Sequence, residues 1–137
     1  MVMSFFRRRD DSGIDRIEAQ VQLMVTDARH TFDLAMNALT GGSVASVGEE
    51  VRRTDRRINV TEMEIRRELV VHFSVHAAGD ATEMLVFMNM IKDLERIGDY
   101  NKNVFDLAEE GVSFLDADDL DRILGFRDEI SSRIALM

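Results

Sequence analysis

Residues 85–108 read LVFMNMIKDLERIGDYNKNVFDLA, and the spacing of the apolar side chains in this stretch decides the fold. These side chains recur every three or four residues, as they do along one face of an α-helix. The expected core positions are Leu85, Met88, Ile91, Leu94, Ile97, Val104, Phe105 and Ala108. Asp80 with Glu83 resembles a capping box, and Gly111 is a helix stop signal. A long helix is therefore predicted between these two points.

Two stretches before it have the same helical spacing. The first extends from Ile14 to Leu39 and stops at Gly41-Gly42, because glycine adopts the left-handed conformation of a helix end without steric cost. The second begins near Val47 and continues to His76, before the break at residues 77–79. Short connections place consecutive helices antiparallel. The sequence therefore predicts an all-α protein built on an antiparallel three-helix bundle.

A shorter fourth helix is expected after Asp116. Its apolar residues are Leu120, Ile123, Leu124, Phe126, Ile130 and Ile134. The segment reaches Met137 without a cap, so we expect it to be cut short or to pack on a partner. The sequence therefore divides into three predicted parts: a basic and acidic head over residues 1–13, the bundle over 14–111, and the fourth helical segment over 112–137.

Composition excludes several classes of function. The chain has 137 residues, no proline and no cysteine, which fits an all-helical protein and excludes disulfides, cysteine zinc sites, Fe–S clusters and thiol catalysis. Its net charge of −9 disfavours nucleic-acid binding, which needs a basic face. Residues 71–137 hold most of the excess, with 14 acids against 6 bases. No apolar run approaches the roughly 20 residues that span a bilayer, so we expect a cytoplasmic protein without membrane insertion.

Carboxylates are the side chains best placed for chemistry. Glu95 and Asp99 are four residues apart, so they project from one helix face and could share a cation. Asp55 lies on a polar strip of the second helix that would meet them if the two helices pack together. The spacing by itself favours a salt-bridged surface over a metal site. Gly98 between the acids predicts close approach of a neighbouring backbone or a ligand.

Six arginines flank the second helix, and their spacing does not separate salt bridges from an anion-binding surface, although salt bridges are the commoner outcome. They are Arg52, Arg53, Arg56, Arg57, Arg66 and Arg67. His72 and His76 are four residues apart, a spacing that can suit zinc. They lie in the last turn of the second helix, where the helix dipole stabilises imidazolium, so capping of the helix end is the commoner role. The chain has no Glu-x-x-His motif, no Gly-x-Ser-x-Gly motif and no Walker A loop. We therefore expect no enzyme.

Three stretches resemble the PhoU family of phosphate-uptake regulators: residues 55–59 (DRRIN), Asp80 at the start of the third helix, and above all residues 92–99 (KDLERIGD) followed by Asn103. The resemblance covers roughly residues 14–111. It implies a three-helix bundle of PhoU type. Because family members usually carry two such repeats, it also implies that residues 116–137 begin a second repeat or that a homodimer supplies the second bundle.

The resemblance also implies a function. PhoU-family proteins are cytoplasmic, non-enzymatic regulators that couple the ATPase of a phosphate ABC transporter to a sensor histidine kinase. Some bind iron or zinc clusters, and residue by residue the ligands would be Glu95, Asp99 and Asp55. Val51 stands where a further acid is expected. The leading hypothesis is a regulatory adaptor, with tuning by a metal ion as an additional option; the alternatives are a metal-storage bundle and a structural oligomerisation module.

Overall fold

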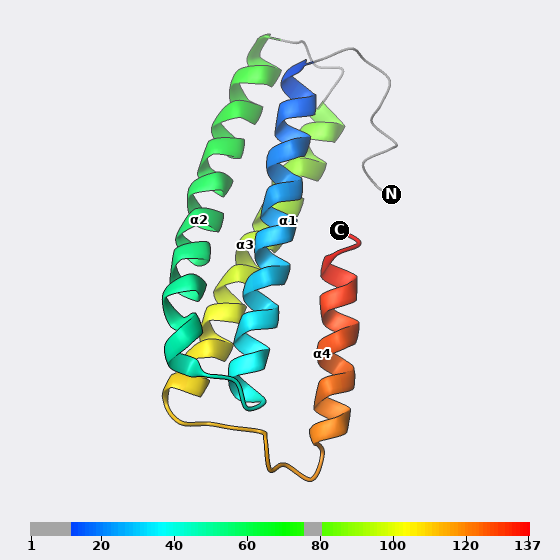
Figure 1. Cartoon of the computed structure of the whole chain (residues 1–137). Coiled ribbons are helices and arrows are strands. Elements are labelled where there is room, and N and C mark those ends of the chain that lie inside the picture. The colour runs from blue at the N-terminus through cyan, green and yellow to red at the C-terminus, as the bar shows by residue number, and fades with distance from the viewer. Residues whose placement is uncertain (1–11, 76–80) are drawn as a thin grey trace.

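The computed structural model describes residues 12–75 and 81–137, which form four α-helices (Figure 1). They are α1 (Ser12–Leu39), α2 (Val44–Val75), α3 (Ala81–Glu109) and α4 (Leu120–Ile134). The described residues contain no strand. The predicted all-α class, with three long helices and a shorter fourth, is confirmed.

Glycine ends α1 and α3 as the sequence predicts. Gly41 and Gly111 have φ values of 112° and 90°, in the region that favours glycine. The following residue in each case donates its N–H to a carbonyl in the last turn of the helix: Gly42 to Asn37 at 2.8 Å, and Val112 to Leu107 at 3.0 Å. These bonds satisfy carbonyls that the helix end leaves unpaired.

Two helix starts differ from the prediction. α2 begins at Val44, three residues before Val47, and α4 begins at Leu120 rather than directly after Asp116. Residues 114–120 form tight turns instead, in which the N–H of Leu120 bonds the carbonyl of Ala117 at 3.1 Å. Residues 76–80, with His76 and the Asp80 cap of the third helix, lie outside the described residues.

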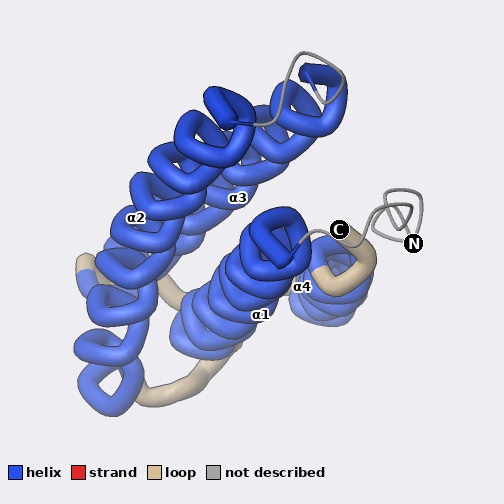
Figure 2. Tube along the Cα trace, turned by 90° about the horizontal axis from the view of Figure 1, so that it is seen from above, coloured by secondary structure: helices blue, strands red, loops and turns tan. Residues whose placement is uncertain are grey.

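Consecutive helices run antiparallel, so that α1 and α3 descend in Figure 1 while α2 and α4 ascend. α1 is central, because α2, α3 and α4 all pack against it. Figure 2, from above, shows α2 and α4 on opposite sides of α1. Among the described residues, the buried acids are Asp27, at the seam between α1 and α2, and Asp55, at the seam between α2 and α3.

The core is made of the apolar stripes of α1, α2 and α3. A larger cluster includes Val21, Ile58, Ile65, Ile91 and Leu94, and a smaller one surrounds Val51 and Phe105. The prediction for Leu85 was wrong, since this side chain is 65% exposed while Phe87 is fully buried. Phe87 precedes Ile91 and Leu94 by four and seven residues, so it shares their face, and Leu85 does not.

α4 is much less buried than the other helices. Only Ser131 and Ile134 of α4 are buried, and Phe126 and Ile130 remain 51% and 44% exposed. The loop before α4 is tied to the end of α1, because the N–H of Phe114 donates to the carbonyl of Leu39 at 2.7 Å. No helix in the described part of the chain is both long and apolar enough to cross a membrane.

Candidate functional site

The α2–α3 seam brings together part of the predicted carboxylate site. Gly98 of α3 faces α2 so closely that a Cβ atom there would lie 3.2 Å from Cδ1 of Ile58. The sequence predicted a close approach at Gly98, but the group that approaches is a side chain of α2 and not backbone or ligand. Gly48 of α2 does the same in reverse, since its Cβ would lie 3.2 Å from the Phe105 ring. This reciprocal fit was not predicted from the sequence.

Asp55 and Asp99 meet at this seam through a lysine. The Nζ atom of Lys102 lies 3.7 Å from Oδ2 of Asp55 and 3.6 Å from Oδ1 of Asp99. Burial raises the pKa of the Asp55 carboxyl, and the charge of Lys102 opposes this rise while that of Asp99 adds to it. The side chain of Asp55 is 11% exposed, compared with 45% for Asp99. Of these two carboxylates, Asp55 is therefore the one whose charge depends more on a nearby cation.

Glu95, the third predicted ligand, has a different partner. Its Oε2 atom lies 2.7 Å from Nζ of Lys92 on the same helix. Val51, where the family resemblance led us to expect an acid, is fully buried in the smaller core cluster. Glu62, on the polar strip of α2, forms an ion pair with Arg66. The structure thus joins Asp55 to Asp99 and pairs Glu95 elsewhere.

The donor set determines whether these residues suit a metal cluster. Within residues 12–75 and 81–137, no group of three or more His, Asp or Glu side chains is arranged to hold a metal ion. A multinuclear iron or zinc centre needs several carboxylate or imidazole ligands at once. The three predicted ligands Asp55, Asp99 and Glu95 are instead paired with lysine ammonium groups. Iron or zinc binding by Glu95, Asp99 and Asp55 stays a prediction.

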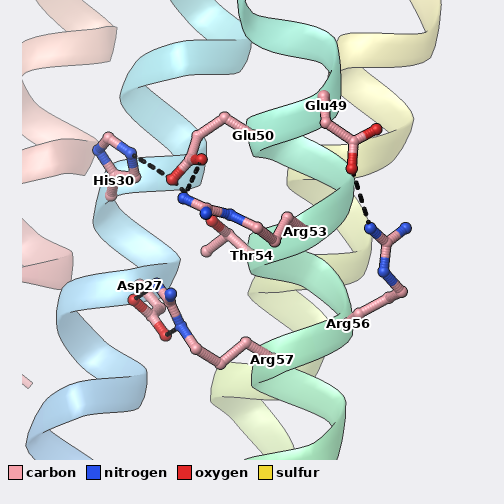
Figure 3. A network of polar contacts seen from close by, with 8 residues as sticks. All are labelled: Asp27, His30, Glu49, Glu50, Arg53, Thr54, Arg56 and Arg57. Atoms are coloured by element: carbon pink, nitrogen blue, oxygen red, sulfur yellow. Dashed lines mark hydrogen bonds and ion pairs between the residues drawn. The ribbon is translucent and has the colours of Figure 1, made fainter.

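A polar network at the α1–α2 seam was missed by the sequence analysis (Figure 3). Asp27 of α1 is buried. The guanidinium of Arg57 donates hydrogen bonds to both of its carboxylate oxygens, with Nε 2.6 Å from Oδ2. This hydrogen-bonded pair raises the pKa of Arg57. One turn away, Nε2 of His30 lies 3.5 Å from Oε1 of Glu50. The only sequence signal for the Asp27–Arg57 pair was the group of arginines on α2, which includes Arg57 but does not indicate Asp27 as its partner.

The arginine flank itself forms salt bridges. Arg52 pairs with Glu109 of α3, Arg53 with Glu50, Arg56 with Glu49, Arg57 with Asp27 and Arg66 with Glu62. Two of these pairs cross between helices, and three join residues within α2. The reading of this flank as paired charges rather than as an anion surface is confirmed for these five arginines. Arg67 lines a cavity of about 520 Å³ between α1 and α2, together with Arg16, Glu68 and His72.

Buried asparagine links α3 to α1. Nδ2 of Asn101 donates to the backbone carbonyl of Ala28 at 2.8 Å, and both residues are buried. A buried amide that finds a partner orients the two helices, whereas an unpaired one would be costly. Asn101 lies one residue before Lys102, so the core contact and the seam contact come from the same turn of α3.

Within residues 12–75 and 81–137, the chain is a bundle of α-helices whose seams are held by paired charges. Comparison with known families specifies the class further. The model of the PhoU domain matches residues 21–108, and the chain therefore belongs to the PhoU family. Comparisons with curated proteins and with solved structures gave no significant match.

The matched range fits the fold. It begins within α1 and ends at the last turn of α3, so it includes both seams and excludes α4. Proteins of this family are regulators of phosphate transport rather than enzymes. The resemblance drawn from residues 55–59 and 92–99 is confirmed by this match.

Proposed function

We propose that this chain is a regulatory adaptor of phosphate uptake and of the phosphate-starvation response, which binds other proteins and catalyses no reaction. The observation that carries the proposal is the family match over residues 21–108, nearly the whole three-helix bundle. The paired charges at both seams support it, because they hold the helices in one arrangement and leave their outer faces for partners.

The proposed partners are the ATPase of a phosphate ABC transporter and the sensor histidine kinase of the phosphate response, and the proposed compartment is the cytoplasm. We further propose that the chain acts as a homodimer. The apolar stripe of α4 supports a dimer, because Phe126 and Ile130 stay exposed after α4 has packed on α1. Light scattering on the purified chain tests this point, and a monomer at micromolar concentration would contradict it.

The outer face of α2 is the surface we assign to the ATPase. Val60, Met63 and Val70 are exposed and spaced by three and seven residues, so they lie on one side of the helix. α1 and α3 pack against the other sides of α2. Exposed apolar side chains in a row, with charged residues beside them, are typical of protein interaction surfaces.

The test is a complementation experiment in cells that lack this gene. Loss of the gene is expected to derepress phosphate uptake and a phosphate-starvation reporter in phosphate-replete medium. The wild-type gene should restore repression, and the double variant Met63→Glu/Val70→Glu should not. Leu23→Glu, an exposed apolar position on α1, is the matched control and should restore repression.

Co-purification then identifies the partner. The wild-type chain and the Leu23→Glu control should retain the transporter ATPase, and the α2 double variant should lose it. Unchanged uptake and reporter activity after gene loss would contradict the adaptor function. In that case stoichiometric metal retention would favour the storage alternative, and its absence would favour a structural oligomerisation module.

A further inference from the structure

The carboxylates at the α2–α3 seam already have a cation between them. Lys102 lies three residues after Asp99 on α3, so both side chains project from the same face of that helix. From there the ammonium reaches across the seam to Asp55 of α2. Its distances to the two carboxylates, 3.7 and 3.6 Å, are nearly equal. One positive charge is thus shared by two acids from two helices.

This geometry meets the electrostatic need of the seam. Two carboxylates at one seam repel each other, and removing a buried carboxylate from water costs free energy unless a positive charge accompanies it. Lysine suits a shared position, because its ammonium is a compact charge with three hydrogens that can be directed to different acceptors. Lys102 is 38% exposed, so its charge remains partly hydrated while it covers Asp55.

In the described part of the chain, no third His, Asp or Glu side chain joins Asp55 and Asp99 in a group that could hold a metal ion. Glu95 is engaged by Lys92, and Val51 contributes only to the core. A metal ion at this seam would therefore find two carboxylates, and it would have to displace Lys102 to reach them. The residues do not fit the multinuclear cluster that the family resemblance implies.

We propose that the ammonium group of Lys102 takes the place of a metal ion in this chain, holding Asp55 of α2 and Asp99 of α3 together. The α2–α3 seam is then closed by a cation that is part of the chain, and the packing of the bundle does not depend on metal supply. This inference does not rest on the proposed adaptor function, because its test uses the purified full chain alone.

The experiment compares three variants with the wild-type chain. Lys102→Met removes the charge and keeps much of the side-chain length, Lys102→Arg keeps the charge, and Lys92→Met removes an exposed ammonium that contacts Glu95 instead. Thermal unfolding and equilibrium dialysis are measured with MnCl2 and with ZnCl2. NaCl at matched ionic strength serves as the screening control. Mn2+ is included because it prefers carboxylate oxygens.

The wild-type chain, Lys102→Arg and Lys92→Met are expected to bind neither ion and to keep the same Tm in all three salts. Lys102→Met should lose about 4 °C in Tm. Mn2+ should restore part of that loss and remain bound after dialysis, and NaCl should do neither. Adding Asp55→Asn to Lys102→Met should abolish the response to Mn2+.

Two results would overturn the proposal. The first is stoichiometric Mn2+ or Zn2+ in the wild-type chain that is lost in Asp55→Asn, since the metal would then displace Lys102. The second is a Lys102→Met protein that does not respond to Mn2+, in which case the lysine is an ordinary ion pair. The wild-type titration gives an answer even if Lys102→Met does not fold, and Lys102→Arg shows whether charge or side-chain shape is required.

Discussion

The two seams of α2 neutralise buried carboxylates in different ways. Toward α1, the planar guanidinium of Arg57 binds both oxygens of Asp27, one cation for one acid. Toward α3, the ammonium of Lys102 is shared between Asp55 and Asp99. A guanidinium fork matches a single carboxylate, and an ammonium acts as a point charge that two carboxylates can approach.

The two seams also differ in how their helices pack. α2 and α3 approach closely where Gly98 faces Ile58 and Gly48 faces Phe105, so that seam depends on shape. The α1–α2 seam is lined by charged side chains along much of its length, including Arg16 with Glu68 at 2.9 Å and His30 with Glu50. We therefore expect the α2–α3 seam to be sensitive to side-chain volume, and the α1–α2 seam to loss of charge.

The largest expected effect is at the close approach of α2 and α3. Gly98→Leu would place a side chain where even a Cβ atom meets Ile58 at 3.2 Å. Overpacking of this kind costs about 2–3 kcal/mol in the free energy of unfolding. Gly125→Leu is the matched control in α4, where a Cβ would have nothing within 4 Å. Urea unfolding of both variants checks the prediction, and equal stability of the two would refute shape dependence.

Removal of a charge at the α1–α2 seam should have the next largest effect. Arg57→Met leaves the Asp27 carboxylate, whose side chain is 6% exposed, without the guanidinium that binds it. We expect a loss of about 2 kcal/mol in the free energy of unfolding, because an uncompensated buried charge is costly. Arg56→Met breaks an exposed pair with Glu49 and should change stability by less than about 0.5 kcal/mol. Similar losses in the two variants would contradict the contrast between buried and exposed pairs.

The smallest expected effect is a pH dependence at Asp55. Its pKa is raised above 3.8 in the folded chain, so the folded state binds this proton more tightly than the unfolded state does. The stability of the wild-type chain relative to Asp55→Asn should therefore increase as pH falls from neutral through the raised pKa towards 3.8. Urea midpoints of both proteins across this range give the difference. A difference that is constant, or that increases with pH, would show that burial does not dominate at this carboxyl.

Much of the fold could be predicted from sequence because its signals are local. The apolar spacing of α1, α2 and α3 and the glycines at positions 41 and 111 depend on neighbours within one or two turns of helix. The α4 stripe was predicted equally well as a pattern, but its burial was not. Phe126 and Ile130 stay exposed because α4 packs mainly on α1. The apolar spacing within one helix does not indicate how many other helices will pack against it.

The site was predicted only in part for a related reason. Asp55 and Asp99 were expected to meet if their two helices packed together, and Lys102 does contact both of them at the α2–α3 seam. The cation between them was not anticipated, although Lys102 is only three residues from Asp99. A long flexible side chain can turn to solvent or to a neighbouring helix, and its sequence position does not choose between these rotamers. Asp27 is a similar case, because its partner is 30 residues away on another helix.

By itself, the sequence determined the helical class, the helix ends marked by glycine, the antiparallel order of α1–α3 and the membership of the PhoU family. These depend on short-range periodicity, backbone conformation and a motif of adjacent residues. Only the tertiary structure decided which side chains meet across the seams: Ile58 against Gly98, Arg57 on Asp27, and Lys102 between two carboxylates. Such contacts depend on the distance and rotation between packed helices, which no single helix specifies.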